Sequence, residues 1–124
     1  MENARIPTAY AEHLNAYLSG GSVEPLLAMF ADDACVERYV LGEPPRVFCG
    51  HEQIEESLLR LPAVGGTFHI TGVQTEGSVV HAWFVTENFA YPLRGTYRFE
   101  LDDEGKIARL YTSAAYNRSA AAKS

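Results

Sequence analysis

Four extended runs in the second half of the chain constrain its fold more than any other feature. Strand-forming residues fill the segments Thr67 to Thr75, Ser78 to Phe89, Leu93 to Leu101 and Ile107 to Ser113. Consecutive strands joined by short turns pair antiparallel, so these segments predict a meander. Such a sheet must cover one face with another layer.

The first half predicts that layer. Apolar residues recur at helical spacing from Thr8 to Ser19, and Gly20-Gly21 ends the helix. Ser22 can cap a second helix over Val23 to Phe30. A third helix follows Gly50, with an apolar face of Ile54, Leu58, Leu59 and Leu61.

Extended segments at Cys35 to Leu41 and Val47 to Cys49 lie between these helices. Helices that precede a meander predict an α+β fold. No linker or repeat divides the chain, so we expect one domain over 1–118 and a frayed tail from Ser119 to Ser124.

Composition excludes several functions. The 124 residues are 47% hydrophobic, enough for a core, and carry a formal charge of −6 without a basic patch, which argues against nucleic-acid binding. No leader follows Met1 and no apolar run is long enough to cross a membrane, which predicts a cytoplasmic protein. Cys35 and Cys49 are too few for a disulfide framework and are expected to be reduced, small buried residues.

Two motifs carry a resemblance to a known family. The segment from Gly21 to Glu37, with Phe30-Ala31-Asp32-Asp33-Ala34 at its centre, and the helix start Gly50-His51-Glu52-Gln53-Ile54 resemble the SnoaL-like and ketosteroid-isomerase-like branch of the nuclear transport factor 2-like superfamily. The resemblance implies a cone: a curved, mixed but mainly antiparallel sheet wrapped around N-terminal helices and enclosing an apolar pocket. It implies isomerases, polyketide cyclases, dehydratases and epoxide hydrolases that need no cofactor, and also domains without catalysis.

The isomerase's own residues are replaced. By the resemblance, its carboxylate base falls at Arg38, its tyrosine at Leu14 and its neutral acid at Tyr97. The strand Ser78 to Phe89 also lacks the Arg-x-Asp pair of limonene-epoxide-hydrolase-like enzymes. A standard ketosteroid isomerase is therefore not expected.

Arg38 and Tyr97 are the polar candidates that remain. If Arg38 lies inside, burial of its charge requires a carboxylate or an anionic ligand, whereas at the rim it would reach water. Tyr97 could donate a hydrogen bond to a carbonyl or oxyanion, or be a core tyrosine bonded to backbone.

Alternation along the strands shows which side chains share a face, and the resemblance implies which face lines the pocket, together with residues of the helices. The expected ligand-binding residues are Leu14, Leu18, Val36, Val40, Leu58, Phe84, Thr86, Asn88, Phe99 and Leu110. Trp83 and Val85 then lie on the outer face and predict a homodimer. A one-residue slip would instead bring His81 and Glu87 into the pocket as an acid–base pair.

Two hypotheses follow. One is a cofactor-independent enzyme acting on a hydrophobic small molecule by acid–base and oxyanion chemistry. The other is a non-catalytic dimer that binds a small ligand or serves in assembly. The histidines lack metal-ligand spacing, so no metal is predicted.

Overall fold

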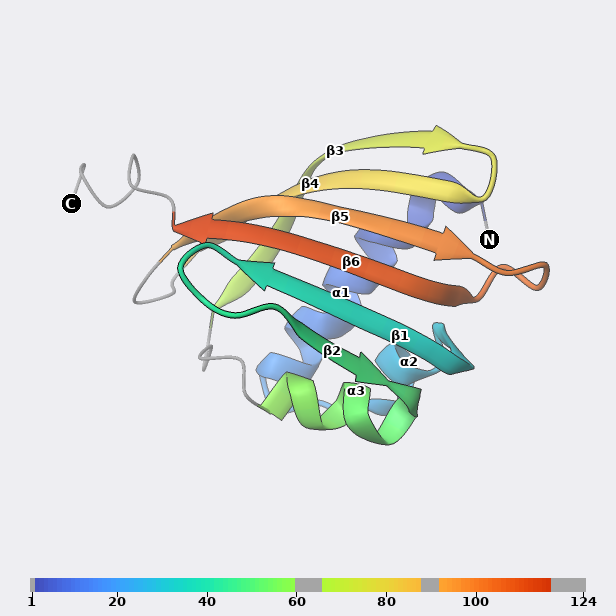
Figure 1. The fold of residues 1–124 in the computed structure, drawn as a ribbon, viewed down its shortest axis with the longest axis horizontal. Coiled ribbons are helices and arrows are strands. Elements are labelled where there is room, and N and C mark those ends of the chain that lie inside the picture. Colours follow the sequence, from blue (N-terminus) through green and yellow to red (C-terminus); the bar gives the residue numbers. More distant parts are fainter. Residues whose placement is uncertain (1, 60–65, 88–91, 117–124) are drawn as a thin grey trace.

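The computed structural model describes residues 2–59, 66–87 and 92–116 (Figure 1). In chain order the elements are the 3-10 helix η1 (Asn3–Arg5), α1 (Ile6–Leu18), α2 (Glu24–Leu27), β1 (Phe30–Val40), β2 (Arg46–Cys49), α3 (Gly50–Leu59), β3 (Thr67–Glu76), β4 (Val79–Glu87), β5 (Leu93–Leu101) and β6 (Ile107–Tyr116). Asn88 and the predicted tail from Ser119 to Ser124 lie outside the described residues.

The strands form one sheet in the order β2-β1-β6-β5-β4-β3. The meander β3 to β6 is antiparallel throughout, as the short turns predict. β1 adds to β6 in parallel, and β2 pairs antiparallel with β1 at the edge. The fold is thus α+β with a mixed, mainly antiparallel sheet.

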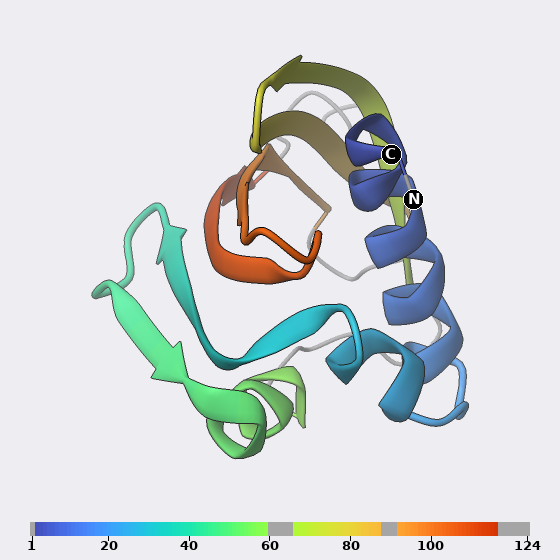
Figure 2. The same cartoon turned by 90° about the vertical axis from the view of Figure 1, so that its right-hand side faces the viewer.

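The sheet curls because its strands slip register at three places. Shifts lie between Phe30 and Cys35 in β1, between Ile70 and Gly72 in β3, and between Glu100 and Leu101 in β5. An extra residue on one strand bends that strand and increases its twist. Figure 2 shows the result: the concave face of the sheet looks toward α1.

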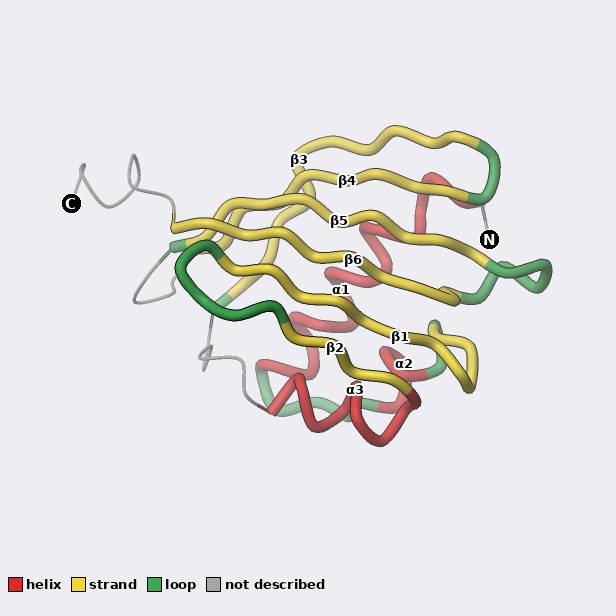
Figure 3. Tube along the Cα trace, in the orientation of Figure 1, coloured by secondary structure: helices red, strands yellow, loops and turns green. Residues whose placement is uncertain are grey.

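Helix α1 covers this concave face. Pro7 stands in its first turn, where a missing N–H costs nothing, and Gly20 with φ 101° follows its end. Its buried side includes Ile6, Tyr10 and Leu14. The helices gather on one side of the sheet (Figure 3), so a single core lies between the two layers.

That core combines α1, α3 and the inward residues of the strands. Its fully buried large side chains include Phe84, Phe99, Leu14, Leu26, Ile54, Ile107, Leu110 and Val80. In the described part of the chain, no helix is long and apolar enough to span a bilayer.

The boundaries differ from prediction around Phe30. The second helix was expected to reach this residue, but α2 ends at Leu27 and β1 already begins at Phe30. The reason is tertiary: the Ile107 N–H donates to the Met29 carbonyl at 2.8 Å, and Phe30 is the register partner of Ile107. Pairing with β6 therefore starts the strand early.

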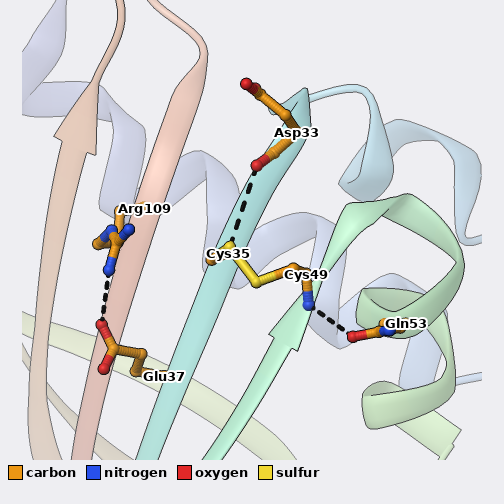
Figure 4. Close-up of a disulfide and its surroundings, with 6 residues drawn as sticks. All are labelled: Asp33, Cys35, Glu37, Cys49, Gln53 and Arg109. Carbon is orange, nitrogen blue, oxygen red and sulfur yellow. Dashed lines mark hydrogen bonds and ion pairs between the residues drawn. A yellow bond between two sulfur atoms is a disulfide. The ribbon is translucent and has the colours of Figure 1, made fainter.

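The prediction that both cysteines are reduced and buried is wrong. Cys35 of β1 and Cys49 of β2 form a disulfide, and Cys49 is exposed (Figure 4). The two residues are direct register partners, with Cα atoms 4.1 Å apart. The hairpin brings them together, and this pairing is invisible in their separation of 14 along the chain.

Candidate functional site

The concave side of the sheet carries the apolar wall. Of the residues predicted to line it, seven are buried: Leu14, Val36, Leu58, Phe84, Thr86, Phe99 and Leu110. Leu18 and Val40 are partly buried and pack against the same cluster. Their roles in ligand binding stay predictions.

The register of β4 is the one predicted without a slip. Ala82, Phe84 and Thr86 are buried, whereas Trp83 and Glu87 are exposed and lie on the other face. The arrangement that would bring His81 and Glu87 inside is therefore not the one found. The Phe84 ring packs against Gly95 of β5, its register partner, in space that a side chain on Gly95 would occupy. This contact holds Phe84 on the inner face.

Aromatic rings form the centre of the wall. The Tyr97 ring stacks on Phe84 with centroids 4.5 Å apart and meets the Tyr10 ring edge-on at 5.4 Å. Tyr10 also packs edge-on against Phe30 and Phe99. Such contacts hold each ring in one orientation and so fix where the two hydroxyl groups point.

Both tyrosines stay neutral far above physiological pH. Burial raises the pKa of Tyr10 to about 12, partly offset by the positive charge of Arg38. Burial also raises the pKa of Tyr97 well above its ordinary value, again with Arg38 acting in the opposite direction. Among the described residues, neither hydroxyl has a hydrogen-bond partner, so both can donate to a guest molecule.

Arg38 lies on the same inner side, between β2 and α3. Its Nη1 donates to the Ser57 carbonyl at 3.4 Å, and its Nη2 donates to the Ser57 Oγ at 3.5 Å. Its guanidinium carbon is 5.4 Å from the centroid of the Phe48 ring. Burial is the main cause that lowers the Arg38 pKa, and the neighbouring tyrosines act against it.

No carboxylate of the described residues forms an ion pair with Arg38. Glu37, the nearest acid in sequence, points to the outer face and pairs with Arg109 at 3.1 Å (Figure 4). It also accepts a hydrogen bond from the Tyr39 hydroxyl at 3.0 Å. Arg38 is half-buried, and within the described part of the chain its hydrogen-bond partners are neutral.

The remaining histidines occupy other places. His69 is 3.5 Å from Glu87 at the exposed end of β3 and β4, and a ring nitrogen of His51 lies 3.1 Å from the Phe30 carbonyl. His13 is partly buried on α1. The described residues thus hold Arg38, Tyr10 and Tyr97 together without a carboxylate or imidazole beside them.

Thr86 is engaged with backbone. Its Oγ1 accepts a hydrogen bond from the Leu93 N–H at 2.7 Å and donates to the Leu93 carbonyl at 3.4 Å. The hydroxyl therefore closes the end of the β4–β5 pair, and what it offers to the interior is its methyl group.

Two polar members of the site were not predicted from sequence. Tyr10 was recognised only as part of the apolar stripe of the first helix, and Ser57 was not singled out. A signal existed for both: Tyr10 precedes Leu14 by one helical turn, and Ser57 follows Ile54 by three residues, which places each on the inward side.

The outer face carries a separate groove of about 690 Å³ that crosses the strands. Tyr39, Trp83, Thr96 and Ser113 lie along it, and Trp83 is 43% exposed. This is the face on which the sequence predicts a partner chain.

This chain resembles known proteins in structure and not in sequence. The sequence matches no family model and no curated protein. Solved structures do match: a protein provisionally named a ketosteroid isomerase from Kribbella flavida has a TM-score of 0.73 at 17% identity, over 90% of this chain and 76% of that one.

Two further neighbours share the architecture. The epoxide hydrolase/cyclase-like enzyme SalBIII has a TM-score of 0.63 at 17% identity over 92% of this chain and 94% of its own. A computationally designed 17-OHP binder has a TM-score of 0.67 at 16% identity over 90% of both chains. At these identities the likeness concerns the fold. The chain accordingly shares the fold of these structures, with the curved, mixed but mainly antiparallel sheet that its motifs predict.

Proposed function

We propose that this protein binds an apolar small molecule inside its cone, with a polar atom of that molecule held by Arg38, Tyr10 and Tyr97. One observation carries the proposal: the hydroxyls of the packed pair Tyr10 and Tyr97 have no hydrogen-bond partners among the described residues, and both lie within electrostatic range of the half-buried Arg38. Small-molecule sites typically combine an apolar lining with a few converging polar groups. The designed 17-OHP binder is an example of such binding on this fold.

Binding is proposed ahead of catalysis because the described interior brings no base to this group. General acid–base catalysis requires a titratable side chain within hydrogen-bond reach of the reacting proton. Glu37, His69, His81 and Glu87 all lie elsewhere.

A cofactor-independent isomerase, cyclase, dehydratase or epoxide hydrolase is the second candidate. The observation in its favour is the donor set itself, since a guanidinium and two neutral phenols could stabilise a developing oxyanion. The epoxide hydrolase/cyclase-like SalBIII shows that the fold hosts such chemistry in another protein.

One experiment separates the two. Enones, epoxides and polyketide-like compounds are screened for a rise in the unfolding midpoint, and each hit is incubated with the protein and analysed by mass spectrometry. Stabilisation without turnover supports binding, because a ligand stabilises the folded state in proportion to its occupancy. Turnover that disappears in Tyr97→Phe would favour the enzyme, and an absence of any stabilising compound would contradict both.

We further propose a homodimer formed through the outer sheet face around Trp83 and Val85. Trp83 and Tyr39 support it, because both are exposed large aromatic residues along the outer groove and apolar side chains that gather on one surface mark interaction sites. Sedimentation should show a dimer that Trp83→Asp converts to a monomer.

The cytoplasmic location stays a prediction. Reduced cysteines were one of its grounds, and the Cys35–Cys49 bond removes that ground because stable disulfides are typical of oxidising compartments. Fractionation of the source cells, with the thiols trapped at lysis, tests the location directly.

A further inference from the structure

We infer that the guest of the cone is a monoanion whose carboxylate, or a comparable oxyanion, pairs with Arg38. The inference rests on the proposed function and names the chemical class of its ligand. It starts from an imbalance: the half-buried guanidinium of Arg38, on the inner side of the sheet, forms no ion pair with a described residue.

The hydrogen bonds of Arg38 leave most of its capacity unused. A guanidinium has five N–H donors, and two of them reach Ser57, at 3.4 and 3.5 Å. These distances are at the long end for hydrogen bonds, and both acceptors are neutral. The Ser57 Oγ is itself committed, because it donates to the Ile54 carbonyl at 2.6 Å.

Neighbouring side chains hold the guanidinium in place instead of neutralising it. Phe48, which faces inward opposite Val36, has its ring centroid 5.4 Å from the guanidinium carbon. Such an aromatic contact positions an arginine and still leaves its N–H groups free to bind an anion.

A second positive residue makes the local imbalance larger. Arg46 on β2 is the direct register partner of Arg38, and its charge lowers the Arg38 pKa further. Glu43 acts in the opposite direction, but its effect on the Arg38 pKa is smaller than that of either tyrosine or of Arg46. Two arginines thus lie opposite each other on β1 and β2, although the whole chain carries a formal charge of −6.

The tyrosines complete a site for an anion. Both hydroxyls stay protonated at neutral pH, so each can donate to a ligand oxygen, and both lie within electrostatic range of Arg38. Hydrogen bonds with an ionised partner are about twice as strong as neutral ones. One cation flanked by two neutral donors balances one negative charge.

The rest of the wall determines what the anion is attached to. Leu18, Val40 and Phe48 are apolar, only partly buried and packed against the core, so they leave surface that a ligand can contact. A ligand that fits both the apolar wall and the donor groups is an amphiphilic monoanion, with an aliphatic or aromatic body and one carboxylate-like head.

The test compares three probes with one tail and different heads: decanoate, decanol and decylamine. Each is titrated by calorimetry at pH 7 into wild-type protein, Arg38→Met, Arg38→Lys and the control Arg94→Met, which removes an exposed arginine on the other face of the sheet. Trp83, the only tryptophan, lies on that other face and reports by its fluorescence if a probe occupies the outer groove instead.

We expect decanoate to bind about tenfold or more tighter than decanol, because a charge-assisted hydrogen bond contributes at least that factor. Decylamine should bind most weakly. Arg38→Met should abolish the preference while decanol binding persists, Arg38→Lys should retain part of it, and Arg94→Met should leave it unchanged. Trp83 fluorescence should not respond in any case.

A second measurement addresses structural roles for Arg38. The hydrogen bonds of Arg38 to Ser57 are long and its contact with Phe48 is partly exposed, so the unfolding midpoint of Arg38→Met should stay close to that of wild type. A clear fall would mean that Arg38 serves the fold, and the inference would be wrong.

The outcomes distinguish a failure of the anionic-ligand inference from a failure of the proposed binding function. Equal binding of decanol and decanoate, unaffected by Arg38→Met, refutes the anionic ligand and leaves an apolar binding protein. If none of the probes binds, or if each binds only with a change in Trp83 fluorescence, the proposed interior site itself is refuted.

Discussion

The side chain of Asn15 on α1 makes two hydrogen bonds with the backbone of Phe68 on β3. Its Nδ2 donates to the Phe68 carbonyl at 2.9 Å, and its Oδ1 accepts from the Phe68 N–H at 2.7 Å. The pair joins the first helix to the far edge strand and thus sets the position of the Tyr10 side of the cone.

Asn15→Ala should lower the free energy of unfolding by about 1–3 kcal/mol, because it removes two partly buried hydrogen bonds between a side chain and the backbone. Urea denaturation measures the loss. Asn3→Ala is the matched control: it removes one exposed bond to the Gly77 carbonyl and should have a much smaller effect. Equal losses in the two variants would show that the α1–β3 contact contributes no more to stability than an exposed hydrogen bond.

Gly95 admits no side chain. A Cβ there would lie 2.9 Å from the Phe84 ring and would overlap the Ser113 carbonyl oxygen. We expect Gly95→Ala to lower the free energy of unfolding by about 2–3 kcal/mol through strain in the β5–β6 pair.

The control for Gly95 is Gly72→Ala, whose Cβ would meet only the edge of the exposed Trp83 ring at 3.3 Å. Thermal unfolding followed by circular dichroism compares the two variants. A Gly95→Ala protein as stable as Gly72→Ala would contradict the packing described for Phe84.

Acid should lower the free energy of unfolding through Glu37, which lies on the outer face. Its partial burial raises its pKa, but hydrogen bonds from Tyr39 and Arg109 more than offset this, so the pKa lies below the ordinary value of 4.5. A carboxyl whose pKa is lowered by folding stabilises the native state above its unfolded pKa, and this contribution disappears as the pH falls below 4.5.

Glu37→Gln should accordingly flatten the decline of the urea midpoint between neutral and acidic pH. Arg109→Met should flatten it less, because the hydrogen bond from Tyr39 to Glu37 remains, and the double variant should resemble Glu37→Gln. Additive effects would mean that Glu37 draws its shift from elsewhere.

Reduction of the Cys35–Cys49 bond should lower the free energy of unfolding by about 3 kcal/mol, the entropy expected for releasing a loop of this length. Urea unfolding with and without a dithiol reductant measures the change. In the double variant Cys35→Ser, Cys49→Ser the midpoint should no longer respond to the reductant. A wild-type protein that unfolds at the same urea concentration in both conditions would show that the bond constrains nothing.

Much of this molecule can be predicted from local patterns. Helical spacing of apolar residues and Gly20 locate α1, and alternation along β4 correctly places Phe84 inward and Trp83 outward. These features depend on residues a few positions apart, whose side chains share a face whatever the rest of the chain does.

The functional arrangement required the tertiary structure. The parallel pairing of β1 with β6, the Cys35–Cys49 bond and the meeting of Tyr10 with Tyr97 all join residues far apart in the chain. The partners of the two neighbouring charges on β1 were likewise decided there, because Glu37 pairs with Arg109 on the outer face whereas Arg38 on the inner face contacts Ser57 and Phe48. Spacing along the chain records which side chains share a face, but the bending of the sheet and the register between distant strands determine which faces meet.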